Sequence, residues 1–200
     1  MLKISITFII SLFLSFNLLA QNADIDLLKN INVNRNQNLD KPFKFISETV
    51  YPVSLAMPIG LLGIGFIKHD KILQQKGLVA LTSLTISMGT TYVLKKIIDR
   101  QRPSITYLFI QPVIIETNGS FPSGHTTAAF ATATSFTLAY PKWYVAVPAY
   151  TWASMVAYSR LHLGVHYPSD ILGGAIIGAG SAWLSHKANS WLQKKEQRKK

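Results

Sequence analysis

Residues 77–94, GLVALTSLTISMGTTYVL, contain no Asp, Glu, Lys or Arg, and this stretch decides the fold class. Four more stretches share the property: residues 51–67, 126–140, 143–158 and 171–185. Each is slightly shorter than the roughly 20 residues of a straight transmembrane helix, so buried helices of a soluble all-α protein are the alternative. Soluble helices need a polar face for water, however, and only 14% of this chain is charged. The pattern favours an all-α, integral membrane bundle of helices.

The N-terminus is a further apolar stretch with one lysine, followed by Ala20 and a polar Gln-Asn pair. This order is typical of a secretory signal peptide, residues 1–20, although Leu18 is larger than the usual residue at that place. A retained first transmembrane helix is the alternative. The chain therefore has about five transmembrane helices, or six if the leader is retained, and both versions place residue 21 outside the cell.

Positive charges support this orientation. Counting the spans from an outer residue 21 puts the loop 68–76 and the tail that follows residue 185 in the cytoplasm, and both are net basic. We expect an extracytoplasmic segment at 21–50 and a basic cytoplasmic tail at 188–200. The net charge of +11 is thus mostly an orientation signal, and no basic patch interleaved with aromatic residues indicates nucleic-acid binding.

Two compositional details limit the chemistry and the packing. The chain has no cysteine, which excludes disulfides, thiolate catalysis and zinc–thiolate sites. Gly174 and Gly178 form a GxxxG pair in the last span, and we expect them to allow close packing against a neighbouring helix.

Three polar stretches lie at the outer ends of the spans in this topology, so they can converge. They are KKIIDRQRPS (95–104), GSFPSGH (119–125) and SRLHLGVHYPSD (159–170). Charged groups at the membrane are costly to place there and by default indicate a functional site.

The first stretch contains two cations seven residues apart, Lys95 and Arg102. Two helical turns separate them, so both side chains point from one face before Pro103 ends the helix. The simpler interpretation of Lys96 and Arg100 is that their long side chains extend from the membrane interface into water.

The second stretch resembles a helix N-terminus. Pro122 suits the first helical position, which places Ser123, Gly124 and His125 in the first turn. The free N–H groups and the positive dipole end of that turn attract an anion, and Gly124 lets the backbone approach it closely. Taken alone, this stretch also fits a capped helix with an incidental histidine.

The third stretch joins a cation to a histidine and a carboxylate. Arg160 follows the end of one span, and His166 and Asp170 are four residues apart. A carboxylate on one imidazole nitrogen fixes the tautomer and the orientation of the ring. Asp170 is the only acid between residues 117 and 195, which makes it the natural partner. His162 fits no such role, and we expect it at the surface or the interface.

These residues together are suited to phosphoryl transfer. Cations and free amides bind phosphate, and arginine does so in bidentate fashion. Two histidines supply a nucleophile and a proton donor. No cluster of carboxylates is left to hold a metal, so the cations would stabilise the transferring phosphoryl group. We therefore expect a metal-independent enzyme without a cofactor.

The spacing of these residues resembles the three-part signature of the type-2 phosphatidic acid phosphatase and vanadium haloperoxidase superfamily. The matching positions are Lys95-x6-Arg102-Pro103, Pro122-Ser123-Gly124-His125 and Ser159-Arg160-x5-His166-x3-Asp170. The resemblance implies a type-2 phosphatidic acid phosphatase domain over residues 51–187.

The resemblance also implies a role for each residue. His166 is the nucleophile that forms a phosphohistidine, Asp170 orients it, and His125 protonates the leaving alcohol. The phosphate oxygens would be held by Lys95, Arg102, Ser123, Gly124 and Arg160.

The function that follows is hydrolysis of a lipid phosphomonoester or diphosphate at the outer leaflet. The enzyme would be a multi-pass protein of the inner (plasma) membrane, with its active site facing the periplasm or the exterior. Its partners would be the lipid phosphate and membrane lipids, and no protein partner is implied. The alternatives are a secreted soluble acid phosphatase, a vanadate-dependent haloperoxidase and a non-enzymatic membrane protein. The motifs read only phosphate and do not choose among lipids.

Overall fold

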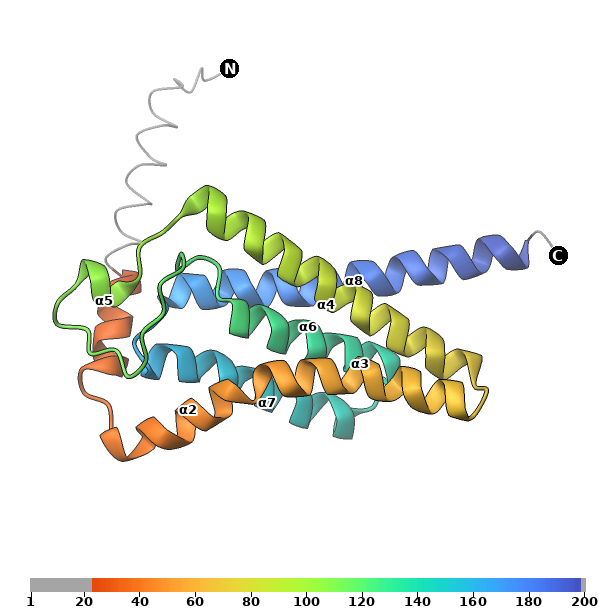
Figure 1. Ribbon diagram of the computed structural model, residues 1–200, viewed down its shortest axis with the longest axis horizontal. Helices are drawn as coiled ribbons and strands as arrows, with labels where there is room; N and C mark the ends of the chain where they lie inside the picture. The colour runs from red at the N-terminus through yellow and green to blue at the C-terminus, as the bar shows by residue number, and fades with distance from the viewer. Residues whose placement is uncertain (1–22, 199–200) are drawn as a thin grey trace, which may run out of the picture.

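The computed structural model describes residues 23–198, and within that range it contains helices and no strand (Figure 1). Residues 23–32 are helical and precede η1 (Gln37–Leu39), α2 (Asp40–Glu48), α3 (Val50–Ile67), α4 (Lys71–Ile98), α5 (Pro103–Thr106), α6 (Gly124–Ala139), α7 (Trp143–His162) and α8 (Pro168–Gln197). The expected all-α class is confirmed. The expected signal peptide lies outside the described residues.

The five charge-free stretches coincide with α3, α4, α6, α7 and α8, apart from Tyr140, which follows the end of α6. Two stretches, Gln37–Ile67 and Lys71–Thr106, are long and apolar enough to cross a membrane by length and composition. The full set of five spans stays a prediction.

Large apolar side chains lie on the outside of the bundle and hydroxyl groups lie inside it. Ile59, Phe66 and Ile176 are 58%, 63% and 63% exposed, whereas Ser83 and Ser87 are fully buried. A protein in water buries its large apolar side chains instead. Small and hydroxyl-bearing residues between helices are typical of bundles in lipid, where the outer face contacts acyl chains.

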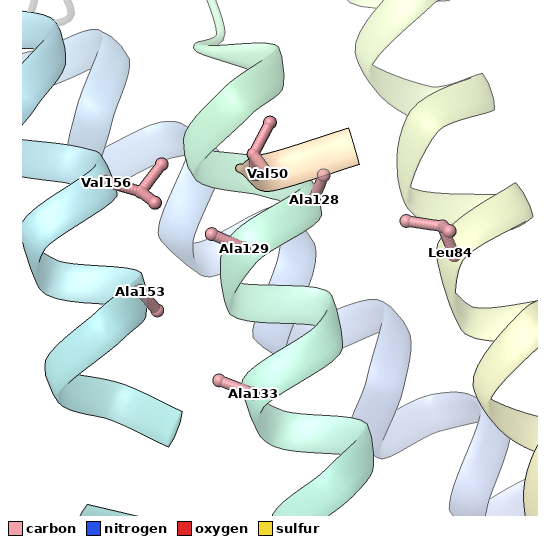
Figure 2. Close-up of a cluster of buried hydrophobic side chains, with 7 residues drawn as sticks. All are labelled: Val50, Leu84, Ala128, Ala129, Ala133, Ala153 and Val156. Atoms are coloured by element: carbon pink, nitrogen blue, oxygen red, sulfur yellow. The ribbon is translucent and has the colours of Figure 1, made fainter. Parts of the chain in front are cut away.

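Helix α6 is central and packs against α3, α4, α7 and α8. Its alanines and threonines leave room for these neighbours, because short side chains let helix backbones approach closely. The buried cluster around it consists of Val50, Leu84, Ala128, Ala129, Ala133, Ala153 and Val156 (Figure 2). This packing fixes the axis of α6 and therefore the position of its N-terminal turn.

The helices bring all three polar stretches to one end of the bundle. The C-terminal ends of α4 and α7 lie beside the N-terminal ends of α6 and α8, at the left of Figure 1, together with α5. The predicted convergence is confirmed.

The contact between α6 and α8 depends on the two glycines of the GxxxG pair. A Cβ on Gly178 would lie 2.3 Å from the carbonyl oxygen of Thr127, and one on Gly174 would lie 2.7 Å from that of Ser123. The close packing expected from the sequence is confirmed. By contrast, a Cβ on Gly180 would meet nothing within 4 Å.

We expect Gly178→Ala to destabilise the bundle, because the new methyl group would push α8 away from α6. Overpacking of this kind costs about 1–3 kcal/mol, and the better helix propensity of alanine offsets at most ~1 kcal/mol of it. Gly180→Ala is the matched control and should keep or raise the unfolding temperature. Thermal unfolding of both purified variants in detergent tests this. Equal unfolding temperatures would contradict the packing argument.

Candidate active site

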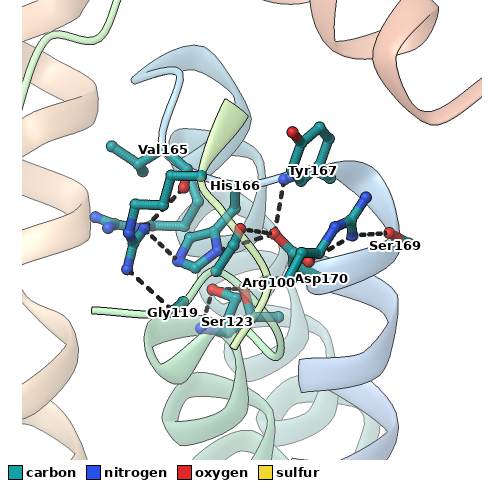
Figure 3. Close-up of polar contacts among 12 residues, drawn as sticks. Arg100, Gly119, Ser123, Val165, His166, Tyr167, Ser169 and Asp170 are labelled. Atoms are coloured by element: carbon teal, nitrogen blue, oxygen red, sulfur yellow. Dashed lines mark hydrogen bonds and ion pairs between the residues drawn. The ribbon is translucent and has the colours of Figure 1, made fainter. Parts of the chain in front are cut away.

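His166 lies in the connection between α7 and α8 and is 1% exposed. Its Nδ1 is 3.2 Å from Oδ2 of Asp170 (Figure 3). Its Nε2 is 3.4 Å from Nη1 of Arg102. A carboxylate only accepts hydrogen bonds and a guanidinium only donates them, so the proton lies on Nδ1 and Nε2 keeps its lone pair. Burial lowers the pKa of His166 to about 4, although the hydrogen bond to Asp170 opposes this. The imidazole is therefore neutral at pH 7.

Asp170 is fully buried in the first turn of α8. Besides His166, its Oδ2 accepts hydrogen bonds from the backbone N–H of Tyr167 at 2.9 Å and from the hydroxyl of Ser120. Its Oδ1 accepts one from Nη1 of Arg100 at 2.8 Å. The expected pairing of Asp170 with His166 is confirmed, and the donors around the carboxylate hold it in one orientation.

The N-terminus of α6 differs in detail from the prediction. The helix begins at Gly124, with Ser123 as its N-cap, so the expectation that Pro122 occupies the first helical position is wrong. The hydroxyl of Ser123 caps the helix, and its backbone N–H donates to the carbonyl oxygen of Asp170 at 3.0 Å. This bond ties the start of α6 to the start of α8.

His125 lies in the first turn of α6, as expected. Its ring packs against that of Tyr51 from α3, with 4.9 Å between the ring centroids. The imidazole therefore lies beside the pocket described below, with an aromatic ring on one side.

Lys95 and Arg102 do not share a helix, so the prediction of one helix up to Pro103 is wrong. Helix α4 ends at Ile98, because Asp99 adopts a left-handed conformation with φ 43°. Lys95 donates to the carbonyl oxygen of Gly119, and Arg102, the N-cap of α5, donates through Nε to that of Asn118 at 2.8 Å. Both cations thus hold the loop that precedes α6.

Arg102 and Arg160 meet at one carboxylate, that of Glu116. Nη2 of Arg102 is 2.7 Å from Oε2 of Glu116, and Nη2 of Arg160 contacts Oε1. Burial raises the pKa of Glu116, but the two guanidinium groups outweigh it and hold the pKa at about 2. Nη1 of Arg160 donates to the hydroxyl of Ser47 at 2.6 Å, and its Nε has no hydrogen-bond partner among residues 23–198. Glu116 therefore occupies the position where an anion would bind the two arginines.

These residues surround a pocket of about 320 Å³. It is lined by Tyr51, Lys95, Ile115, Glu116, Thr117, Asn118, Gly124, His125 and His166. Four of the predicted site residues thus line one cavity. Arg102 and Arg160 do not line the pocket, but both contact Glu116, which does. Ser123 and Asp170 are buried beside it.

The sequence interpretation missed several residues of the site. Arg100 was expected to extend into water, but it contacts Asp170. His162 was expected at the surface, but it is 2% exposed, and its Nε2 is 2.8 Å from Oδ1 of Asp40. Glu116 carried a usable signal, since it is the only acid between residues 100 and 169. In residues 23–198 no three His, Asp or Glu side chains gather as metal ligands. Metal independence stays a prediction.

The fold is a helical membrane bundle with a cationic pocket at one end, and the sequence matches the PAP2 superfamily over residues 76–194. The chain belongs to this superfamily, as its motifs predicted. The lipid A 4'-phosphatase of Bacteroides thetaiotaomicron is 32% identical over 125 residues, which are 58% of this chain and 56% of that protein. The undecaprenyl-diphosphatase of Sulfolobus acidocaldarius is 29% identical over 84% of this chain and 79% of its own length.

A solved structure supports the same assignment. The transmembrane PAP2-type phosphatidylglycerolphosphate phosphatase of Bacillus subtilis superimposes with a TM-score of 0.71 at 28% identity. The match covers 90% of this chain and 95% of that one. The shared fold is that of a membrane phosphatase, which confirms the expected fold class and branch of the family.

We expect Glu116→Gln to bind inorganic phosphate about tenfold more tightly, a difference of ~1.4 kcal/mol. The reason is that phosphate must displace the carboxylate from Arg102 and Arg160, whereas a neutral amide competes poorly for them. The shift of the unfolding temperature with phosphate concentration measures this affinity without an activity assay. Glu48→Gln, which changes an exposed glutamate paired with Lys44, is the control and should bind as the wild type does. Weaker or unchanged binding in Glu116→Gln would show that the carboxylate does not compete.

Proposed function

We propose that this protein hydrolyses the phosphomonoester or diphosphate of a membrane lipid through a phosphohistidine on Nε2 of His166. One observation carries the proposal. The ring of His166 is held between Asp170 and Arg102, and its unprotonated Nε2 lies at a pocket lined by Lys95 and His125. A neutral imidazole whose lone pair meets a cationic pocket is suited to attack phosphorus.

In the first step, Nε2 of His166 attacks the phosphorus while the bond to the lipid oxygen breaks. Arg102 and Arg160 bind the phosphoryl oxygens once Glu116 has moved aside, and Lys95 adds a third positive charge. The negative charge of the bound substrate favours the protonated form of His125, which donates its proton to the leaving oxygen. The new imidazolium keeps its Nδ1 proton, and Asp170 stabilises the positive charge.

In the second step, water attacks the phosphohistidine. His125, now neutral, takes a proton from the water as the oxygen–phosphorus bond forms and the phosphorus–nitrogen bond breaks. Inorganic phosphate leaves, and His166 returns with the lone pair on Nε2. Each histidine thus ends the cycle as it began.

The substrate class rests on the pocket and on the relatives. The relatives act on lipid A, undecaprenyl diphosphate and phosphatidylglycerolphosphate, which share a phosphate on a large amphiphile. The polar lining of the pocket is suited to bind the phosphate and does not distinguish one lipid from another. Purified protein in detergent, assayed with these three lipids and phosphatidic acid for phosphate release, tests the proposal, and inactivity on all four would refute it.

A secreted soluble phosphatase with the same site is the second candidate. The exposed apolar side chains of the outer helix faces oppose it, since water would contact residues such as Ile67, which is 81% exposed. The proposed enzyme instead spans the inner membrane several times. We further propose that its phosphatase domain comprises residues 51–187 and that its active site faces the exterior.

We expect His125→Ala to slow hydrolysis of a lipid phosphate by about 10²–10⁴-fold, the usual contribution of a general acid. Hydrolysis of p-nitrophenyl phosphate should fall much less, because p-nitrophenolate leaves without a proton. His166→Ala, which lacks the nucleophile, should lose both activities. Steady-state rates of the two variants on both substrates check this. Equal losses for His125→Ala would take the proton-donor role away from His125.

The orientation of the site can be measured because the chain has no cysteine of its own. Thr106, exposed near the site, and Gln197, exposed near the C-terminal end of α8, are suitable positions for single cysteines. On intact cells, an impermeant maleimide should label Thr106→Cys, whereas Gln197→Cys should react only after lysis. The opposite labelling would place the site in the cytoplasm and refute the outer-leaflet substrate.

A further inference from the structure

Arg100 belongs to none of the three motifs, yet it is bound to the centre of the site. Its Nη1 donates to Oδ1 of Asp170 at 2.8 Å and to the hydroxyl of Ser169 at 2.6 Å (Figure 3). Its guanidinium carbon lies 3.8 Å from the centroid of the Tyr167 ring, which is a cation–π contact. The side chain is thus fixed on three sides by the residues that follow His166 in the chain.

Asp24 fixes the same guanidinium from the other side. Its Oδ2 is 2.7 Å from Nη2 of Arg100 and accepts the hydroxyl of Ser169 at 2.5 Å. Its Oδ1 accepts the backbone N–H of Ser169 at 2.7 Å. That N–H lies in the first turn of α8, where no carbonyl within the helix can accept it. Asp24 therefore caps the turn that contains Asp170 and holds Arg100 at the same time.

The two oxygens of Asp170 have different partners as a result. Oδ1 faces Arg100, and Oδ2 faces His166, Tyr167 and Ser120. Without Arg100, the buried Oδ1 would lose the hydrogen bond that this side chain supplies and the carboxylate could rotate about its Cβ–Cγ bond. A rotated carboxylate would no longer hold the Nδ1 proton of His166 in line.

Charge balance explains why the arginine is paired with a second acid. A lone guanidinium on Asp170 would draw its negative charge away from His166, and the positive charge that His166 gains on phosphorylation would be less well stabilised. The carboxylate of Asp24 offsets this cation, so the pair supplies geometry while adding little net charge. Both side chains are largely shielded from solvent, with 27% and 8% exposure for Arg100 and Asp24, so screening by water is incomplete.

We propose that Asp24 and Arg100 form a positioning pair that holds Asp170 in register with His166. This inference rests on the proposed phosphatase function. Asp24 lies outside residues 76–194, the part that matches the superfamily, so the N-terminal segment completes the site through this pair. The pair acts through Asp170 and does not touch the substrate.

The test measures phosphate release from phosphatidic acid, phosphatidylglycerolphosphate, undecaprenyl diphosphate and lipid A by the purified full-length protein in detergent. Arg100→Met keeps the stem against Tyr167 but removes the guanidinium. We expect kcat to fall by about 10²-fold, the scale of a small misplacement of a reacting group, with KM changed less than about threefold because phosphate contacts remain. Asp24→Asn should lower kcat by a smaller factor, and Arg100→Lys should recover part of the loss.

A double variant separates positioning from a general structural effect. Arg100→Met should cause no further loss in Asp170→Asn, because the orientation of Asp170 is then already irrelevant. Arg35→Met is the matched control, since it breaks another shielded ion pair of the N-terminal segment, with Asp40 at 3.0 Å, and should keep kcat. The unfolding temperatures of all variants are measured in parallel.

The outcomes are distinct. A wild-type protein inactive on all four lipids refutes the phosphatase proposal itself. An active wild type with an unchanged kcat in folded Arg100→Met refutes only the positioning pair. Equal losses from Arg100→Met in the wild-type and Asp170→Asn backgrounds also refute it, because the effect would then not pass through Asp170. If Arg100→Met does not fold, Arg100→Lys and Asp24→Asn decide by the same double-variant comparison.

Discussion

The carboxylate of Asp170 is the point at which the separate parts of the site are joined. It is fully buried, and it accepts hydrogen bonds from His166 and Tyr167 in the connection between α7 and α8, from Ser120 before α6 and from Arg100 after α4. A buried carboxylate is tolerable only when such donors replace its hydration. The same bonds that satisfy the charge therefore fix three chain segments relative to the imidazole of His166.

The bundle beneath the site supplies rigidity through small residues. Gly174 and Gly178 let α8 approach the backbone of α6, and this contact places the first turns of the two helices side by side. The hydrogen bond from Ser123 to the backbone of Asp170 is possible only at that approach. Large apolar side chains are left to the outer face, where lipid rather than helix packing surrounds them. Small residues between the helices thus fix the geometry of the site, and large apolar residues on the outside provide the surface that contacts lipid.

The cationic part of the site needs an anion even without substrate. Arg102 and Arg160 are 2% and 1% exposed, and two buried guanidinium groups near each other are unfavourable unless a negative charge lies between them. Glu116 provides that charge at the free site. In the proposed reaction, substrate binding would exchange one anion for another, so the free energy of desolvating the arginines would be offset before phosphate binds.

The fold class and four residues of the candidate pocket could be predicted from the sequence, because helix patterns and motifs are encoded locally. Charge-free stretches indicate helices in a nonpolar medium, and Asp170, as the only acid near His166 in the sequence, indicates that the two side chains pair. The local pattern wrongly predicted one helix up to Pro103, because α4 already ends before Asp99, which adopts a left-handed conformation. Only the tertiary structure decided the contacts of Arg100 with Asp24 and of Arg160 with Ser47, which are 76 and 113 residues apart. Such contacts depend on how the helices pack and on the paths of the loops between them, and no periodicity or spacing in the chain records either.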